Sequence, residues 1–98
     1  MEFQTENDFS LSYYPAMPKS TAAFNTPDES TEWLRVRMNK LGISSLEELA
    51  KLTGIDRGTI SRYFHHDRRP SIDVLEPFCQ ALQVSPETLL KALGAIPK

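Results

Sequence analysis

Four arginines are the side chains in this sequence best suited to bind an anion. They are Arg57, Arg62, Arg68 and Arg69, and the only acidic residue within this span is Asp67. A guanidinium group is planar and always charged, so it can donate two parallel hydrogen bonds to a phosphate or to a base edge. A local cluster of this kind attracts a polyanion more effectively than a diffuse charge does, although an ordinary solvated helix face can carry a similar cluster. The residues indicate an anion-binding surface, and the elements around them decide between these two interpretations.

A second group of reactive side chains forms the run His65-His66-Asp67. Adjacent residues cannot easily converge on one tetrahedral metal ion, and the sequence holds no other histidine. The single cysteine, Cys79, falls in the apolar pattern of a later helix, and no nucleophile is paired with a base. We therefore expect no metal, no cofactor and no enzyme activity. If the two histidines lie beside phosphate and gain a proton, binding should strengthen as pH falls through about 6.5.

Two short helices folded against each other should position the arginines. Ser45 and Glu48 have the spacing of a capping box, which predicts that the first helix begins there. Gly54 should end it, because a residue without a Cβ enters the left-handed conformation at little cost, and Asp56 should cap the second helix. The apolar side of the first helix is predicted to be Leu46, Leu49, Ala50 and Leu52. On the second helix, 57–65, the apolar stripe is Ile60, Tyr63 and Phe64, and the opposite, cationic face is Arg57, Gly58, Ser61, Arg62 and His65.

The flanking sequence predicts three further helices. Thr26, Pro27 and Glu29 have the pattern of a capped helix start, and Gly42 should end that first helix. Ser85 and Pro86 repeat this pattern at the start of a last helix, with Leu89, Leu90 and Leu93 facing inward and Gly94 after it.

The helix between these two contains Pro77, which removes a backbone hydrogen bond. It must therefore be kinked, or begin late with Pro77 in its first turn. Ser71, or a capping box of Asp73 and Glu76, could open it. Its expected core residues are Ile72, Leu75, Phe78, Cys79 and Leu82.

Length and charge divide the chain unequally. Ninety-eight residues suit one small domain. Residues 1–25 mix polar residues and prolines with scattered aromatics without a helical period, so we expect a flexible acidic arm before a domain of residues 26–98. Residues 1–30 hold one lysine and five acids, whereas residues 31–98 hold ten basic residues and eight acids, for net charges of −4 and +2.

There is no apolar run long enough to cross a membrane, no signal peptide is visible, and a single cysteine fits a reducing compartment, so the predicted location is cytoplasmic.

Three small or branched residues in the two central helices identify a family. Ala50, Gly54 and Ile60 have the spacing found in helix-turn-helix proteins of the lambda repressor and Cro (Xre) group, which this chain resembles from about residue 29 to residue 94. A small residue at Ala50 allows the second helix to cross closely, and Ile60 fills the gap between the helices. The similarity continues through Arg69-Pro70-Ser71, through Ala81 to Ser85, and at Leu89. It implies an all-α, five-helix, lambda-repressor-like domain that binds double-stranded DNA.

In this family the second helix of the motif enters the major groove, so the resemblance implies a role for each polar residue near it. The residues expected to touch bases are Arg57, Gly58, Thr59, Ser61 and Arg62. Those expected to touch phosphate are Ser44, Ser45, His65, His66, Arg68 and Arg69. The sequence departs from the family at Leu46, where relatives often carry a phosphate-binding glutamine, and at His66, which replaces a frequent loop glycine.

The resemblance also implies a homodimer on two half-sites, because one short helix buries little surface. The expected function is a sequence-specific transcriptional regulator, most simply a repressor. The alternative is an antitoxin-like or adaptor protein whose aromatic arm, residues 1–25, binds a protein partner.

Overall fold

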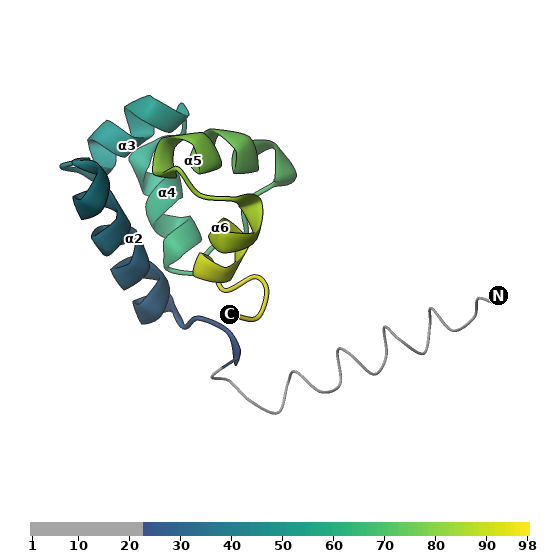
Figure 1. The fold of residues 1–98 in the computed structure, drawn as a ribbon. Coiled ribbons are helices and arrows are strands. Elements are labelled where there is room, and N and C mark those ends of the chain that lie inside the picture. The colour runs from purple at the N-terminus through teal and green to yellow at the C-terminus, as the bar shows by residue number, and fades with distance from the viewer. Residues whose placement is uncertain (1–22) are drawn as a thin grey trace.

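The computed structural model describes residues 23–98, which form five α-helices and one 3-10 turn (Figure 1). The elements are α2 (Pro27–Leu41), α3 (Leu46–Thr53), α4 (Arg57–Phe64), η2 (Ile72–Val74), α5 (Leu75–Leu82) and α6 (Pro86–Ala92). Residues 23–98 contain no strand, and the predicted all-α class with five helices is confirmed. Most of the predicted flexible arm, residues 1–22, lies outside the described residues. Its last residues lie against the domain, since the Lys98 amide donates to the Ala23 carbonyl at 2.7 Å.

The predicted boundaries of α2 are confirmed by its caps. The Thr26 hydroxyl accepts from the Glu29 amide at 3.2 Å, and the Glu29 carboxylate accepts from the Thr26 amide at 2.9 Å. This is a complete capping box, with Pro27 as the first helical residue. At the other end Gly42 adopts a left-handed conformation with φ of 73°, which a glycine reaches without steric strain.

The start of α3 differs from the prediction in one respect. Ser45 caps the helix by accepting from the Glu48 amide at 3.1 Å, as expected. The Glu48 carboxylate, however, reaches one residue further back and accepts from both the amide and the hydroxyl of Ser44, each at 2.8 Å. The reciprocal capping box is therefore absent, and Ser44 takes part in the cap instead.

The predicted apolar face of α3 was wrong at Leu52, whose exposed fraction is 56%. Leu49 is fully buried, and the position one turn after it on the same face belongs to Thr53. Thr53 can occupy this buried site because its hydroxyl donates to the Leu49 carbonyl at 2.9 Å. The turn that follows is as predicted: Gly54 has φ of 76°, and Asp56 caps α4 by accepting from the Thr59 amide at 3.1 Å.

Pro77 is accommodated by a late start of α5. The helix begins at Leu75, so Pro77 is in its first turn, where its missing amide removes no helical bond. Neither predicted cap forms, because Val74 is the N-cap residue and makes no side-chain cap. The assignment of Ile72 to the core was also wrong. It lies in η2 and is 83% exposed, because the 3-10 turn interrupts the helical periodicity that the prediction assumed.

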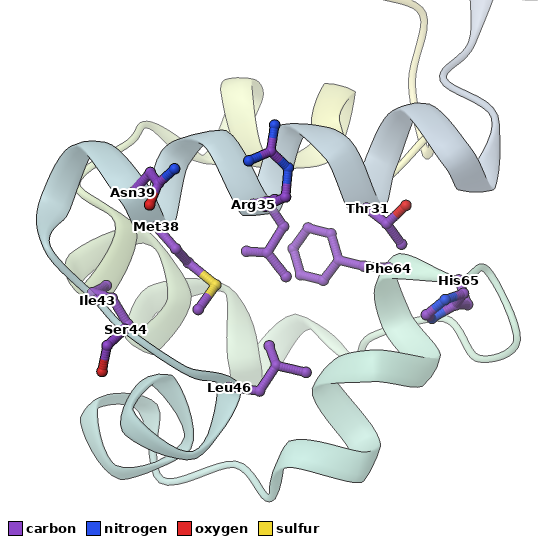
Figure 2. A pocket seen from close by; sticks show the side chains of 10 residues that line it. Thr31, Arg35, Met38, Asn39, Ile43, Ser44, Leu46, Phe64 and His65 are labelled. Atoms are coloured by element: carbon purple, nitrogen blue, oxygen red, sulfur yellow. The ribbon is translucent and has the colours of Figure 1, made fainter.

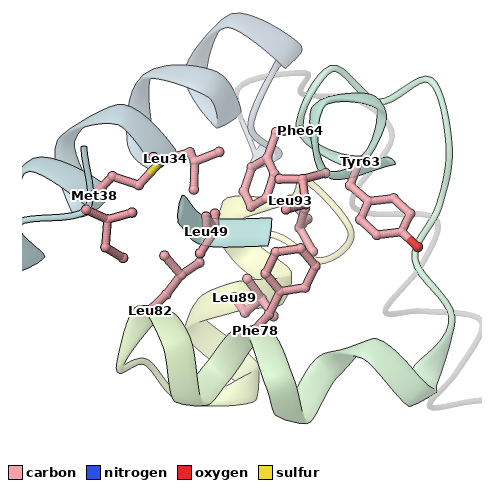
Figure 3. Packing of buried hydrophobic residues seen from close by; sticks show 11 residues of the cluster. Leu34, Met38, Leu49, Tyr63, Phe64, Phe78, Leu82, Leu89 and Leu93 are labelled. Carbon is pink, nitrogen blue, oxygen red and sulfur yellow. The ribbon is translucent and has the colours of Figure 1, made fainter. Parts of the chain in front are cut away.

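The core joins α4 to every other helix (Figure 3). Phe64 lies at its centre, stacked on Trp33 of α2 at a centroid distance of 6.4 Å. It also meets Phe78 of α5 edge-on at 6.0 Å, a favoured aromatic geometry. The fully buried aliphatic side chains around these rings are Leu49, Ile60, Leu82, Leu89 and Leu93. The apolar side of α4 is thereby fixed inside the bundle, and its polar side faces outward.

Candidate nucleic-acid interface

Helix α4 is divided into a buried and an accessible side, as its periodicity predicts. Ile60, Tyr63 and Phe64 are each at most 4% exposed. On the other side Arg57, Arg62 and His65 are exposed, whereas Gly58, Thr59 and Ser61 are half-buried. Four of the residues predicted to touch bases, Arg57, Gly58, Ser61 and Arg62, therefore lie on the accessible side of α4, and Thr59 lies between that side and the buried stripe.

The arginines of α4 are not held by strong internal ion pairs. The Arg57 Nε atom lies 4.0 Å from a carboxylate oxygen of Glu47, and these side chains are 67% and 72% exposed. An exposed contact of that length is weak and is readily exchanged for a phosphate or a base. Arg62 and Arg68 form no ion pair with any residue in the described part of the chain. All three guanidinium groups are available to an external anion.

The N-terminus of α4 carries a fixed negative charge beside these arginines. The Thr59 hydroxyl donates to Asp56 at 2.6 Å, and this bond, with the Thr59 amide and the nearby Arg62 charge, lowers the pKa of Asp56. Thr59 has thus used its hydroxyl hydrogen and can offer a ligand only its oxygen lone pair. Gly58 is packed locally, because a Cβ there would lie 3.2 Å from an Asp56 carboxylate oxygen.

At the start of α3, Ser44 and Ser45 are both exposed but serve the helix cap described above. The Ser44 amide and hydroxyl lower the pKa of Glu48, which keeps a carboxylate close to both serines. His65 lies at the end of α4, where its Nδ1 is 2.8 Å from the Ser61 carbonyl. Because a carbonyl can only accept, Nδ1 carries a hydrogen and donates. In the neutral ring Nε2 then accepts from water, and it can donate to a phosphate only when the ring is protonated.

Two residues predicted to bind phosphate also make hydrogen bonds within the domain. His66 has φ of 65°, and its Nε2 lies 2.7 Å from the hydroxyl of Ser30, a fully buried residue of α2. The guanidinium of Arg69 donates to the Leu93 carbonyl at the end of α6, at 2.8 Å. These contacts tie the loop after α4 to α2 and α6. Of the basic residues in that loop, Arg68 keeps its charge directed at solvent.

Sequence reasoning missed these loop contacts and one similar contact of Arg37. The guanidinium of Arg37 donates to the carbonyls of Leu82 and Gln83, each at 2.8 Å. Gln83 is left-handed with φ of 57° at the end of α5, so this helix end has no glycine to terminate it. Two features of the sequence could have indicated these contacts. No glycine follows α5, and a histidine replaces the frequent loop glycine after α4, so long polar side chains are needed at both places.

An apolar hollow of about 300 Å³ lies beside the interface, between α2, the start of α3 and the end of α4 (Figure 2). Met38, Leu46 and Phe64 contribute to its lining, and Ser44 and His65 lie at its edge. Its apolar lining offers little to a phosphate.

The contact between His66 and Ser30 predicts a pH dependence of stability. Burial lowers the pKa of His66, and the charge of Arg69 lowers it further. The folded state therefore favours the neutral ring, whereas the unfolded chain takes up a proton below about pH 6.5. The stabilisation is complete above that pH and is lost as pH falls from about 6.5 toward the lowered pKa. We expect the unfolding free energy of the native protein to decline over this range.

The His66→Asn variant should lose this part of the pH dependence, because asparagine tolerates the left-handed conformation but does not titrate. Urea unfolding at a series of pH values measures the unfolding free energy of each variant. His65→Asn is the matched control. An unchanged pH profile in His66→Asn would contradict the assignment.

Comparison with known proteins gives one match. The family model described as Cro/C1-type HTH DNA-binding domain matches residues 33–93, which include α3, α4 and most of the core. Searches of curated proteins and of solved structures returned no significant match.

No helix in residues 23–98 is long and apolar enough to span a membrane. Within the same residues, no group of three or more His, Cys, Asp or Glu side chains lies close enough together to hold a metal ion.

Proposed function

Because the chain belongs to the Cro/C1-type HTH DNA-binding domain family, we propose that it is a sequence-specific transcriptional regulator of double-stranded DNA. It inserts the helix of residues 57–65 into the major groove and acts as a repressor, by occupying sites that other proteins need. The proposal places it in the cytoplasm and pairs two copies on two half-sites of an operator.

The accessible face of α4 is the observation that carries this proposal. The major groove admits one α-helix, and the side chains of its N-terminal half then lie against the base edges. Arg57 is in the first turn of α4, is two-thirds exposed, and has only a long contact with Glu47. A guanidinium in that place can donate to both O6 and N7 of a guanine. Arg62, five residues later on the exposed side of α4, adds a contact to bases or backbone.

Selection of bound sequences from random duplex DNA tests the proposal. It should be run near physiological salt, so that attraction to phosphate alone does not retain every sequence. We expect enrichment of one motif with at least one fixed guanine per half-site. Recovery of unenriched DNA with the native protein, at salt concentrations where binding still occurs, would contradict sequence-specific recognition.

Arg68→Ala should weaken binding to all sequences alike. Arg68 is exposed in the loop after α4 and is expected to contact phosphate, which carries no sequence information. Losing one phosphate contact should reduce the slope of log K against log salt by about 0.9. Titrations of operator and unrelated duplex at several salt concentrations measure both effects.

Lys91→Ala is the control, since Lys91 also carries a positive charge but pairs with Glu87 on α6 at 3.3 Å. It should leave the slope unchanged. A selective loss of operator binding in Arg68→Ala, with unrelated DNA bound as before, would assign Arg68 to a base instead.

A further inference from the structure

The apolar hollow beside α4 extends inward to the core of the domain (Figure 2). Leu34, Met38 and Phe64 contribute to its lining, and all three are buried core residues. Leu46, the first residue of α3, points toward them from across the hollow. Its volume of about 300 Å³ is at the lower end of the range for small-molecule sites in proteins. The hollow therefore has the size and the apolar walls of a site for a small ligand.

Polar side chains surround the mouth of the hollow, and none of them is acidic. They are Thr31, Arg35, Asn39, Ser44 and His65. Arg35 is the only residue of the lining with a permanent charge, and that charge is positive. An anionic group at the mouth would be attracted to this charge, whereas a cationic group would be repelled. The charge of the lining thus favours an anion.

Arg35 and Asn39 have hydrogen-bonding capacity left for a ligand. The Arg35 guanidinium donates to Glu32 through Nε at 3.1 Å and Nη2 at 2.6 Å, which leaves Nη1 available. The side chains of this pair are 61% and 59% exposed, so their ion pair is weak and Arg35 can turn toward a ligand. Asn39 is exposed, and its amide group can donate two hydrogen bonds.

We propose that the hollow binds a small amphipathic carboxylate. Its apolar body packs on Met38, Leu46 and Phe64, and its carboxylate lies at the mouth beside Arg35 and Asn39. A guanidinium and a carboxylate are matched in shape as well as in charge. A cavity of about 150 Å³ is enough for one benzene ring, so this hollow accommodates an aromatic ring with a short acid side chain.

The position of the hollow indicates what the ligand does to DNA binding. Ser44 and His65 lie at its edge, and both are expected to contact phosphate. A carboxylate held at this edge places a negative charge where the DNA backbone would lie, so ligand and DNA compete. This competition rests on the proposed function, whereas ligand binding by itself does not.

Titration of the full chain with phenylacetate tests the site without DNA. Backbone amide NMR signals of Met38, Leu46 and Phe64 should shift saturably, and those of α6 should not. Phenylacetamide has the same shape without the charge and should bind about threefold more weakly, which is what an exposed ion pair contributes. Phenethylamine carries the opposite charge and should bind more weakly still.

Arg35→Gln tests the position of the carboxylate. This variant should bind phenylacetate about threefold more weakly than the native protein and phenylacetamide equally well. Lys91→Gln is the control, because Lys91 carries the same charge and pairs with Glu87 on α6, away from the hollow. It should match the native protein with both compounds.

Leu46→Asn tests the position of the apolar body. It replaces part of the apolar wall with an amide and should weaken the binding of both compounds about tenfold. Leu52→Asn is the control, since Leu52 is an exposed leucine on the same helix outside the hollow. Thermal unfolding of each variant confirms that it is folded.

Saturating phenylacetate should also weaken operator binding by the native protein, and the same concentration should have little effect on Leu46→Asn. Absence of saturable shifts around the hollow, equal binding of phenethylamine, or equal losses in Leu46→Asn and Leu52→Asn would overturn the proposal. Binding that appears only after deletion of residues 1–22 would assign the hollow to the arm instead. If phenylacetate binds but operator affinity is unchanged, the competition is wrong. If phenylacetate binds and no duplex is bound, the ligand site stands and the proposed DNA function fails.

Discussion

The Arg57→Ala variant should lose most of the preference for operator over unrelated DNA while remaining folded. A good bidentate contact between a guanidinium and a guanine contributes roughly 1–3 kcal/mol of discrimination, which corresponds to a fall of about 5- to 150-fold in the specificity ratio. Arg57 is exposed and its only ion pair within residues 23–98 is the long contact with Glu47, so the native fold should not depend on it. Competition between labelled operator and unlabelled random duplex, at fixed salt, measures the ratio.

Arg68→Ala is the comparison for this result, because it removes an equal charge from the same surface. It should lower the affinity for both DNAs and leave their ratio unchanged. If Arg57→Ala kept the full preference, or if the two variants behaved alike, Arg57 would be a phosphate contact and another residue of α4 would read the bases.

Among single substitutions on α4, Phe64→Ala should destabilise the protein most. Phe64 is 1% exposed and lies between Trp33 of α2 and Phe78 of α5. Replacing a buried phenylalanine with alanine typically costs about 3–5 kcal/mol, because transfer energy is lost and a cavity remains. The free energy of unfolding of a small domain is about 5–15 kcal/mol in total, so a large share of the variant should be unfolded near physiological temperature. Urea unfolding followed by circular dichroism measures the loss.

Phe64→Leu is the control, since it keeps most of the buried apolar volume and should be destabilised much less. DNA binding by Phe64→Ala should fall only in proportion to the folded fraction, and recover at lower temperature or with excess operator. A stability loss below about 1 kcal/mol in Phe64→Ala would mean that the aromatic packing does not hold α4 in place.

The local features of the fold could be predicted from the sequence, because they depend on neighbouring residues. Thr26 with Glu29, Gly54 and Asp56 each act within four positions along the chain, and each forms the cap or turn that its type favours. The face of α4 followed from the same local rule, since the spacing of Ile60, Tyr63 and Phe64 fixes which side is buried.

The errors have physical causes that local patterns do not contain. Leu52 was predicted to be buried, but Thr53 occupies the buried site instead. It can do so because its hydroxyl donates to the Leu49 carbonyl. Ile72 was misplaced because a 3-10 turn changes the periodicity just before α5.

The loop contacts were missed for a related reason. His66 and Ser30 are 36 positions apart, and Arg69 and Leu93 are 24 apart, so only the packed structure brings them together. A histidine and an arginine next to a DNA-binding helix fit phosphate contacts equally well when only their sequence positions are known.

The proposed function requires the Arg57-bearing face of α4 to lie in the major groove. Dimethyl sulfate footprinting tests it directly, because the reagent methylates guanine N7 in the major groove and adenine N3 in the minor groove. With a selected operator, the native protein should protect guanine N7, and Arg57→Ala should lose protection at one guanine in each half-site while others stay protected. Protection confined to adenine N3, or a guanine pattern identical in the two proteins, would contradict the account.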